Sequence, residues 1–343
     1  MKIRPHWNTA VGRLLFATFI LAYALGRATV QTVSPVWIGT DTSIQGNGGS
    51  GAKFTAFSQR MVQPITYAGT VSALSSSTLT DTNASWSNGQ FGTNGLLSYV
   101  EFDNGWMADI ADSSANNHSL VLAGPLTWVV SAGDAYRIRP HSTIATLLGT
   151  NNAAGLQTGL NPAQADNVLI LIPETQQTVT IFYFSNTTVH GWFRADFSAA
   201  GNQIIYPEQG LLIRRIGPGN LHLYLSGPIK SGSAAVPIVQ GLNLISTLQS
   251  ITNLPLSALN LYTGNPLTGI SSGLNPTAGD NLLLLQPDGS SATYFYYKDS
   301  KGNEGWMDAL FNSAAAVPIN AGNAFYIRRR PPNGSFNWLV PQQ

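Results

Sequence analysis

The sequence predicts a mainly β protein, in which a small N-terminal β module is followed by a duplicated β-sandwich or barrel unit with short helices. Charged residues make up only 10% of the 343 residues, whereas Gly (34) and Pro (19) are abundant, and this composition suits short strands joined by many turns. Apolar runs are short and are bounded by turn residues. Much of the second half also repeats after 114 residues, which is typical of two copies of one structural unit.

Residues 1–28 are predicted to be a signal peptide. Lys2, Arg4 and Arg13 form a positive region around the start of an apolar run of 12 residues, 14–25. This run is shorter than the ~20 residues that span a bilayer, so a cleaved export signal is favoured over the alternative, an uncleaved membrane anchor. Candidate cleavage sites follow Ala24, Gly26 and Ala28. We therefore expect a secreted or outer-envelope protein with no membrane span in the mature chain.

The charge and the cysteine content argue against several classes of function. Removal of residues 1–26 takes away three positive charges and no negative ones, so the formal net charge falls from +1 to −2. A nearly neutral chain has no electrostatic basis for binding nucleic acid or anionic membranes. Because the chain has no cysteine, it has no disulfide, no thiolate nucleophile and no zinc–cysteine site. We expect neither a metal ion nor a cofactor.

Residues 29–140 are predicted to form the N-terminal β module. The stretch 69–86 (GTVSALSSSTLTDTNASW) reads as two short strands joined by turns, and the segments 119–124 and 135–139 read as later strands. Gly105-Trp106 followed by Ile138 is a weak echo of the repeat. The spacing from this Trp to this Ile is 32 residues, against 21 in the repeat, so we predict a separate module.

The repeat divides the remaining chain into units at 141–230 and 231–343. GLNPAQADNVLIL (159–171) returns as GLNPTAGDNLLLL (273–285). Gly-Trp and Ile-Arg-Arg sequences return with the same offset, at 191–192 and 305–306 and at 213–215 and 327–329. This shared register predicts that the two units adopt one shape.

Each unit has the same predicted order of elements. A short helical stretch (144–148 in the first unit, 255–261 in the second) precedes an Asn-Pro turn in which Asn caps and Pro follows. The strands predicted after this turn are 168–172, 179–184, 211–216 and 221–225 in the first unit, and 282–285, 292–297, 325–330 and 336–340 in the second. A further candidate strand, 235–247, joins the units.

These stretches resemble a known family. The segments that carry the resemblance are TLTDTNASW, GDAYRIRPHSTIATLLG, GLNPAQADN with its echo, GWFRAD, YPEQGLLIRR and SFNWLVPQ. The family consists of uncharacterised secreted proteins that occur as many paralogues in Verrucomicrobia and related bacteria. The resemblance covers roughly residues 54–343 and implies export, but it implies no particular activity.

Several motifs that could carry chemistry lack the context that the chemistry needs. GNGGSG (46–51) is not flanked by the strand and helix of a dinucleotide site. Ser271 lies in a G-x-S-x-G motif, but the corresponding residue of the first unit is Gln157, so turn-forming glycines explain the motif better than a nucleophile. Asp166 and Asp280 each precede Asn, which favours turn capping over a calcium site of about six to eight oxygen ligands. No pair of carboxylates is singled out for glycoside hydrolysis.

Arginine recurs at the ends of predicted strands. Neighbouring strand residues face opposite sides, so one Arg of each pair could face inward and meet a carboxylate. Protection of an edge strand, together with packing of the Arg stems, is the interpretation that we favour. Recognition of an acidic glycan or phosphate is the alternative. The residues concerned are Arg137, Arg139, Arg214, Arg215, Arg328, Arg329 and Arg330.

Aromatic residues are the remaining candidates for a binding site. Exposed rings can stack on sugars, whereas buried rings build the core, and recurrence in both units favours the core for most of them. The Gly-Trp loops are the places where exposure is expected. The candidate ligand-binding residues are Trp106, Trp192, Trp306, Tyr183 and Tyr297.

The sequence therefore favours an exported, non-enzymatic structural protein of the cell surface or extracellular matrix. A carbohydrate-binding module that uses exposed Trp and Tyr is the first alternative, and a polysaccharide-degrading enzyme is the second. The expected partners are glycans or other envelope proteins.

Overall fold

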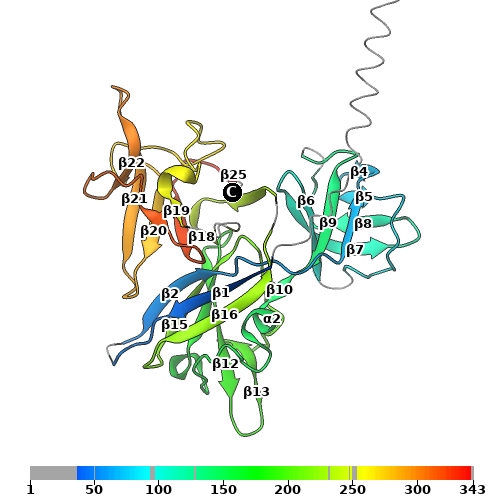
Figure 1. Cartoon of the computed structure of the whole chain (residues 1–343), viewed down its shortest axis with the longest axis horizontal. Coiled ribbons are helices and arrows are strands. Elements are labelled where there is room, and N and C mark those ends of the chain that lie inside the picture. Colours follow the sequence, from blue (N-terminus) through cyan, green and yellow to red (C-terminus); the bar gives the residue numbers. More distant parts are fainter. Residues whose placement is uncertain are drawn as a thin grey trace, which may run out of the picture.

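The computed structural model is mainly β, as the composition and the strand pattern predict (Figure 1). It describes residues 37–49, 51–92, 97–126, 129–230, 232–246, 248 and 253–340. The predicted signal peptide, residues 1–28, lies outside these residues. The described chain forms three parts with separate hydrophobic cores, which we call unit 1, unit 2 and the inserted module.

Unit 1 is built on a five-stranded antiparallel sheet in the order β13-β12-β11-β15-β2. A two-stranded ribbon of β1 and β16, the short pair of β10 and β14, and the helix α2 complete its core. The elements are β1 (Trp37–Ile44), β2 (Lys53–Ser58), β10 (Ser142–Thr143), α2 (Ile144–Leu148), β11 (Asn167–Ile172), β12 (Gln177–Ser185), β13 (His190–Arg194), β14 (Ile204–Ile205), β15 (Gly210–Arg215) and β16 (Leu221–Pro228).

Unit 2 has a five-stranded sheet in the corresponding order, β22-β21-β20-β24-β18. The ribbon of β17 and β25 and the pair of β19 and β23 take the places of β1–β16 and β10–β14. Where a longer helix was expected at 255–261, a single 3-10 turn forms. The elements are β17 (Ala234–Ile238), β18 (Gly241–Ser246), β19 (Leu254–Pro255), η2 (Leu256–Ala258), β20 (Asn281–Leu285), β21 (Ser291–Lys298), β22 (Glu304–Asp308), β23 (Pro318–Ile319), β24 (Ala324–Arg329) and β25 (Phe336–Val340).

The inserted module is a seven-stranded sheet in the order β3-β9-β6-β7-β8-β5-β4, and it lies to one side of both units in Figure 1. Its first part contains three short strands where two were expected, and β6 and β7 were not predicted. Its strands are β3 (Tyr67–Thr70), β4 (Ala73–Ser75), β5 (Thr78–Thr80), β6 (Ser98–Phe102), β7 (Met107–Ser114), β8 (Ser119–Leu122) and β9 (Ala135–Pro140).

The predicted boundary of the N-terminal module, 29–140, is wrong at its start. Residues 29–36 lie outside the described chain, and β1 and β2 belong to unit 1, where β1 pairs with β16 and β2 pairs with β15. The physical reason is burial: Ile44 and Phe57 are fully buried in the core of unit 1. The module is therefore inserted between β2 and β10 of a unit that begins before it.

Units 1 and 2 make reciprocal contacts with each other. The Ser246 amide on β18 donates to the Glu208 carbonyl at 2.9 Å, and the Ser58 amide on β2 donates to the Gly322 carbonyl at 2.9 Å. Bridges between Gln209 and Ile245 and between Asn323 and Phe57 lie beside these bonds. In each case the turn before the fourth strand of one sheet binds the end strand of the other sheet.

A buried Asp–Arg pair connects the strands within each unit. The Asp166 carboxylate accepts from Arg215 Nη1 at 2.6 Å and from the amides of Gln157 and Ile216, each at 2.7 Å. The Asp280 carboxylate repeats this arrangement with Arg329, at 2.5 Å, and with the Ser271 amide at 2.7 Å.

The edge-strand interpretation of the arginines is wrong for these strands. The strands β15 and β24 are each flanked by two others, and Asp280 and Arg329 are almost fully buried. The module has a similar inward-facing arginine, since Arg139 Nε lies 2.9 Å from Glu101 Oε1. Desolvation of the arginine is offset by its carboxylate, which is why one Arg of each pair can face inward.

Loss of the Asp280 charge is expected to destabilise unit 2. The variant Asp280→Asn leaves Arg329 buried without a counter-charge, and this should lower the free energy of unfolding by about 3–5 kcal/mol. Chemical denaturation followed by tryptophan fluorescence measures the change. The control is Asp288→Asn, an exposed turn residue, for which a loss of about 1 kcal/mol or less is expected. Equal losses in the two variants would contradict the role of the pair.

Candidate functional site

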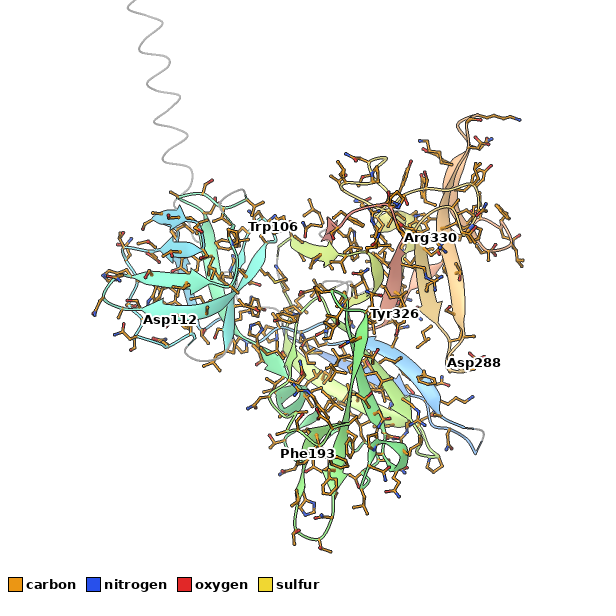
Figure 2. The ribbon with its side chains drawn as sticks, turned by 180° about the vertical axis from the view of Figure 1, so that it is seen from behind. Trp106, Asp112, Phe193, Asp288, Tyr326 and Arg330 are labelled. Carbon is orange, nitrogen blue, oxygen red and sulfur yellow. The ribbon has the colours of Figure 1, made fainter. Side chains whose placement is uncertain are left out.

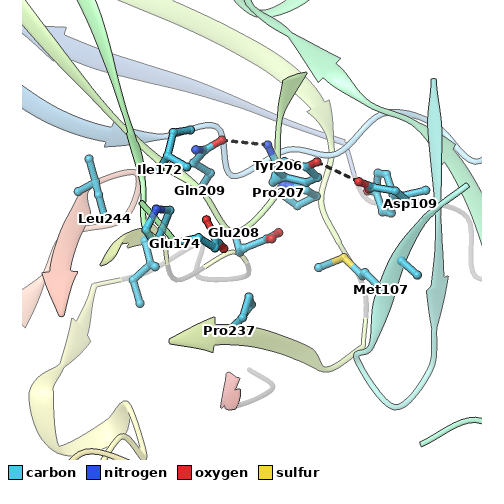
Figure 3. Close-up of a pocket in the computed structure, with 14 residues that line it drawn as sticks. Met107, Asp109, Ile172, Glu174, Tyr206, Pro207, Glu208, Gln209, Pro237 and Leu244 are labelled. Carbon is cyan, nitrogen blue, oxygen red and sulfur yellow. Dashed lines mark hydrogen bonds between the residues drawn. The ribbon is translucent and has the colours of Figure 1, made fainter. Parts of the chain in front are cut away.

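A pocket of about 470 Å³ opens where unit 1, unit 2 and the inserted module meet (Figure 3). Strands β6 and β7 of the module form one wall, and the turn 206–209 and the loop after β11 form a second. Strands β17 and β18 of unit 2 close the third side. The lining residues are Tyr99, Met107, Ala108, Asp109, Ile172, Pro173, Glu174, Tyr206, Pro207, Glu208, Gln209, Pro237, Leu244 and Ile245.

Hydrogen bonds between the three parts hold this pocket in shape. The Tyr206 hydroxyl of unit 1 donates to Asp109 Oδ2 of the module at 2.9 Å (Figure 3). Glu208 is tied to unit 2 through its carbonyl and the Ser246 amide. The Ala235 amide at the start of unit 2 donates to the Gly105 carbonyl of the module at 3.0 Å. Each wall is therefore bonded to another.

Glu208 is the most perturbed acid of the pocket. Its Oε2 atom is buried and makes no hydrogen bond within the described chain. Burial, together with the nearby carboxylates of Asp109 and Glu174, raises the pKa of Glu208 from 4.5 to about 7, and the backbone amide of Glu208 and the charge of Lys230 oppose this shift. Near neutral pH this side chain therefore exists in both protonation states.

Asp109 has one hydrogen-bond partner and one close polar neighbour. Besides the Tyr206 hydroxyl, His141 Nε2 lies 3.1 Å from Asp109 Oδ1, although the angle is not that of a hydrogen bond. Burial and the Asp109 charge together raise the pKa of Tyr206, so this hydroxyl stays protonated and remains a donor. Asp109 is the anchored carboxylate of the pocket, in contrast to Glu208.

A buried ionic cluster lies beside Tyr99 on the same face of β6. Glu101 pairs with Arg139, and its Oε2 atom lies 3.7 Å from Lys230 Nζ. Lys230 also donates to the Ser233 carbonyl at 2.7 Å, and burial lowers its pKa. This cluster ties β6 and β9 of the module to the segment that joins the two units.

The pocket brings together groups that are typical of a binding or acid–base site. A carboxyl group with a raised pKa beside other carboxylates is the pattern of general acid catalysis. A polysaccharide-degrading enzyme requires at least two carboxylates in one pocket, and this pocket contains them. Among the residues described, no group of three or more His, Asp or Glu side chains is arranged to hold a metal ion. No helix of the described chain is long and apolar enough to cross a membrane.

Three of the five aromatic residues predicted to bind ligand lie in the cores. Trp192 is 3% exposed and Trp306 is 5% exposed. Tyr183 packs edge-on against Trp192, with a centroid distance of 5.1 Å. These rings have no free face for a sugar, so the prediction for these residues is wrong, and their recurrence reflects packing.

Trp106 and Tyr297 are only partly buried. Trp106 lies on the side of the module that faces unit 2, and Phe193 lies far from it on unit 1 (Figure 2). Tyr297 corresponds to Phe184 and not to Tyr183, because the β20–β21 hairpin is one residue shorter than the β11–β12 hairpin. The residue that matches Tyr183 is Tyr296, which meets Trp306 as Tyr183 meets Trp192.

Exposed aromatic residues do occur at matching positions of the two sheets. Phe197 and Phe311 are each 51% exposed. Phe197 contacts Phe184, and Phe311 contacts Tyr297, with centroid distances of 6.1 and 6.4 Å. Sequence reasoning concentrated on tryptophan and tyrosine and missed this pair, although the offset of 114 residues relates the two phenylalanines.

Sequence reasoning also missed the pocket itself. Asp109, Glu174 and Glu208 belong to three separate segments, and none stands in a recognisable motif. The sequence contains only indirect information about this site. Glu208 aligns with Gly322 in the repeat, so its carboxylate has no counterpart in unit 2.

Comparison of the chain with protein-family models, with curated proteins and with solved structures found no match.

The protonation of Glu208 predicts a pH dependence of stability. Because the unfolded state loses this proton near pH 4.5 and the folded state near pH 7, stability falls as the pH rises between these values. Glu208→Gln removes the effect, so at about pH 8 the variant should be about 2–3 kcal/mol more stable than the wild type, with little difference at about pH 4. Denaturation at both pH values measures this. The control Glu304→Gln alters an exposed carboxylate, and its stability should depend on pH as that of the wild type does. If the stability of Glu208→Gln also depends on pH as that of the wild type does, the raised pKa of Glu208 is refuted.

Proposed function

We propose that the chain is an exported, non-enzymatic structural protein of the cell surface or extracellular matrix, and a member of the secreted paralogous family that it resembles. The observation that carries this proposal is what the two units share. In each unit the aspartate, Asp166 or Asp280, accepts from its arginine and from the amide of the residue after that arginine, and these bonds hold backbone segments together. The recurring residues thus serve the framework, as expected if a duplication copied a building block.

The sheet edges suit a protein that persists outside the cell. The Arg194 amide on β13 donates to the Ser198 carbonyl at 2.9 Å, and the Asp308 amide on β22 donates to the Asn312 carbonyl at 3.0 Å. The chain returns along each outer strand and occupies part of its free hydrogen-bonding edge. Occupied edges do not recruit strands from other molecules, so the protein can be abundant without aggregating.

Carbohydrate binding is the second candidate function. It is favoured by the exposed Phe197 and Phe311, each of which lies beside a partly buried aromatic ring. Two such pairs at matching positions could bind two segments of a repetitive glycan by stacking.

The structural proposal predicts the location and the inactivity of the protein. In fractionated cultures of the source organism the chain should be found in the envelope or the medium without residues 1–28, and the purified chain should release no sugars from a polysaccharide panel. N-terminal sequencing and a reducing-sugar assay measure these outcomes. Turnover that is lost in Glu208→Gln would overturn the proposal in favour of the enzyme.

A glycan array separates the second candidate from the first. If the chain binds a glycan through stacking, the double variant Tyr297→Ala/Phe311→Ala should weaken binding about tenfold, which corresponds to about 1–1.5 kcal/mol. The matched control is Leu310→Ala, because Leu310 is exposed next to Phe311 but has no ring. Binding that both variants retain would exclude these residues as the binding surface.

A further inference from the structure

The junction pocket contains acidic side chains that the described chain leaves unneutralised. Glu208 Oε2 is buried without a hydrogen bond. Glu174 is exposed at the rim and forms no ion pair with a described residue. Figure 3 draws these two side chains close to each other, while Asp109 already accepts a hydrogen bond from the Tyr206 hydroxyl.

A second observation also points to a ligand. Tyr99 lines the same pocket and is only 3% exposed, yet its hydroxyl has no hydrogen-bond partner within the described chain. An unmade hydrogen bond of a buried hydroxyl is unfavourable. The pocket therefore presents an acceptor oxygen, Tyr99 Oη, in addition to the carboxylates.

Apart from Tyr206 and Gln209, the rest of the lining is apolar. Three prolines (173, 207 and 237), Met107, Ile172, Leu244 and Ile245 surround the acidic groups. A hydrated metal ion gains nothing from such a lining, whereas a hydrocarbon chain does. The volume of about 470 Å³ lies within the range of small-molecule sites, about 300–1,000 Å³.

We infer that the junction pocket binds a small organic cation, namely a primary ammonium or a guanidinium group carried on an apolar chain. The cationic group lies between the carboxylates of Glu208 and Glu174 and donates to Tyr99 Oη. The apolar chain contacts the prolines and Leu244. This inference does not depend on the structural role proposed above.

Binding of the cation depends on the ionisation of Glu208. A positive charge beside Glu208 favours the carboxylate over the acid, so affinity rises with pH through about 7, and binding at lower pH releases a proton. Lys230 does not replace the ligand, because its ammonium group faces Glu101 and the Ser233 carbonyl. The titratable and charged groups around Glu208 are Tyr99, Glu101, Asp109, Arg139, His141, Glu174, Tyr206 and Lys230.

Calorimetric titration of the full mature chain at low salt tests the inference. The probes are n-pentylammonium and n-pentanol, which share the apolar chain and differ in charge. At about pH 8 the ammonium should bind about tenfold more tightly than the alcohol, and this preference should fall to about twofold at about pH 5.5. A third probe, capped lysine amide, distinguishes two sources of the ammonium group. If it binds more tightly than pentylammonium, the natural cation is a polypeptide side chain. If it binds more weakly, the natural cation is a free amine.

Variants separate the charge from the cavity. Glu208→Gln should weaken pentylammonium about tenfold and leave pentanol unchanged, whereas Glu304→Gln, on the outer strand β22, should change neither. Met107→Trp fills the pocket without removing a charge and should abolish binding of both probes. Circular dichroism checks that each variant is folded. Equal affinity for the two probes, or undiminished ammonium binding by either folded pocket variant, would overturn the inference.

Discussion

The buried carboxylate at the start of β11, and its counterpart before β20, is the constraint on which each unit depends. Asp166 joins the loop before it through the Gln157 amide, and it joins the end of β15 through Arg215 and the Ile216 amide. Between them β11 and β15 share only three paired residues, so the ladder alone is short. The carboxylate fixes where β15 ends, and the ladder with β2, which pairs residues 210–215, extends the strand back to the turn 206–209 that precedes it. Since this turn carries Tyr206 and Glu208, the carboxylate and the two ladders together set the position of these two residues.

Sequence periodicity was informative where the chain repeats and uninformative where it does not. The strands β11, β12, β15 and β16 and their counterparts β20, β21, β24 and β25 were predicted because the segments that contain them recur with one offset, whereas the short strands β13, β14, β22 and β23 were not predicted. Strands β1 and β2 were assigned to the wrong part, because the inserted module separates them from β10 and removes them from that offset. Alternation along a strand predicted that one Arg of each pair could face inward, but the edge-strand interpretation that we favoured failed because no local signal distinguishes an inner strand from an edge. Position in a sheet is a property of pairing, which the residues of a single strand do not specify.

The pocket could not be predicted for a related reason. Asp109 lies on β7, Glu174 follows β11 and Glu208 precedes β15, and each has unremarkable neighbours in the sequence. Their chemistry arises only where the three parts of the chain, each with its own core, meet and water is partly excluded from Glu208. The prediction that Trp192 and Trp306 bind a ligand failed for a different reason, because here the sequence contained a clear signal that was misinterpreted. Trp192 and Trp306 recur conspicuously, but recurrence in a duplicated framework marks what the framework needs for packing.

The contrast between the two units indicates where a specific role resides. The reciprocal contacts place Glu208 of unit 1 and Gly322 of unit 2 in equivalent turns, each bonded through its carbonyl to the opposite unit. On the unit 2 side the turn carries no acid, and the nearest side chains around Gly322 are those of Arg60 and Thr42. On the unit 1 side the inserted module adds Tyr99 and Asp109 as a wall. The repeat alone would give two similar surfaces at the interface between the units. The inserted module lies against one of these surfaces and converts it into an acidic, partly enclosed pocket. Glu208 is present in only one unit, and its burial is energetically unfavourable. The framework that the two units share therefore does not require it for folding, and this is why a ligand explains Glu208 better than architecture does.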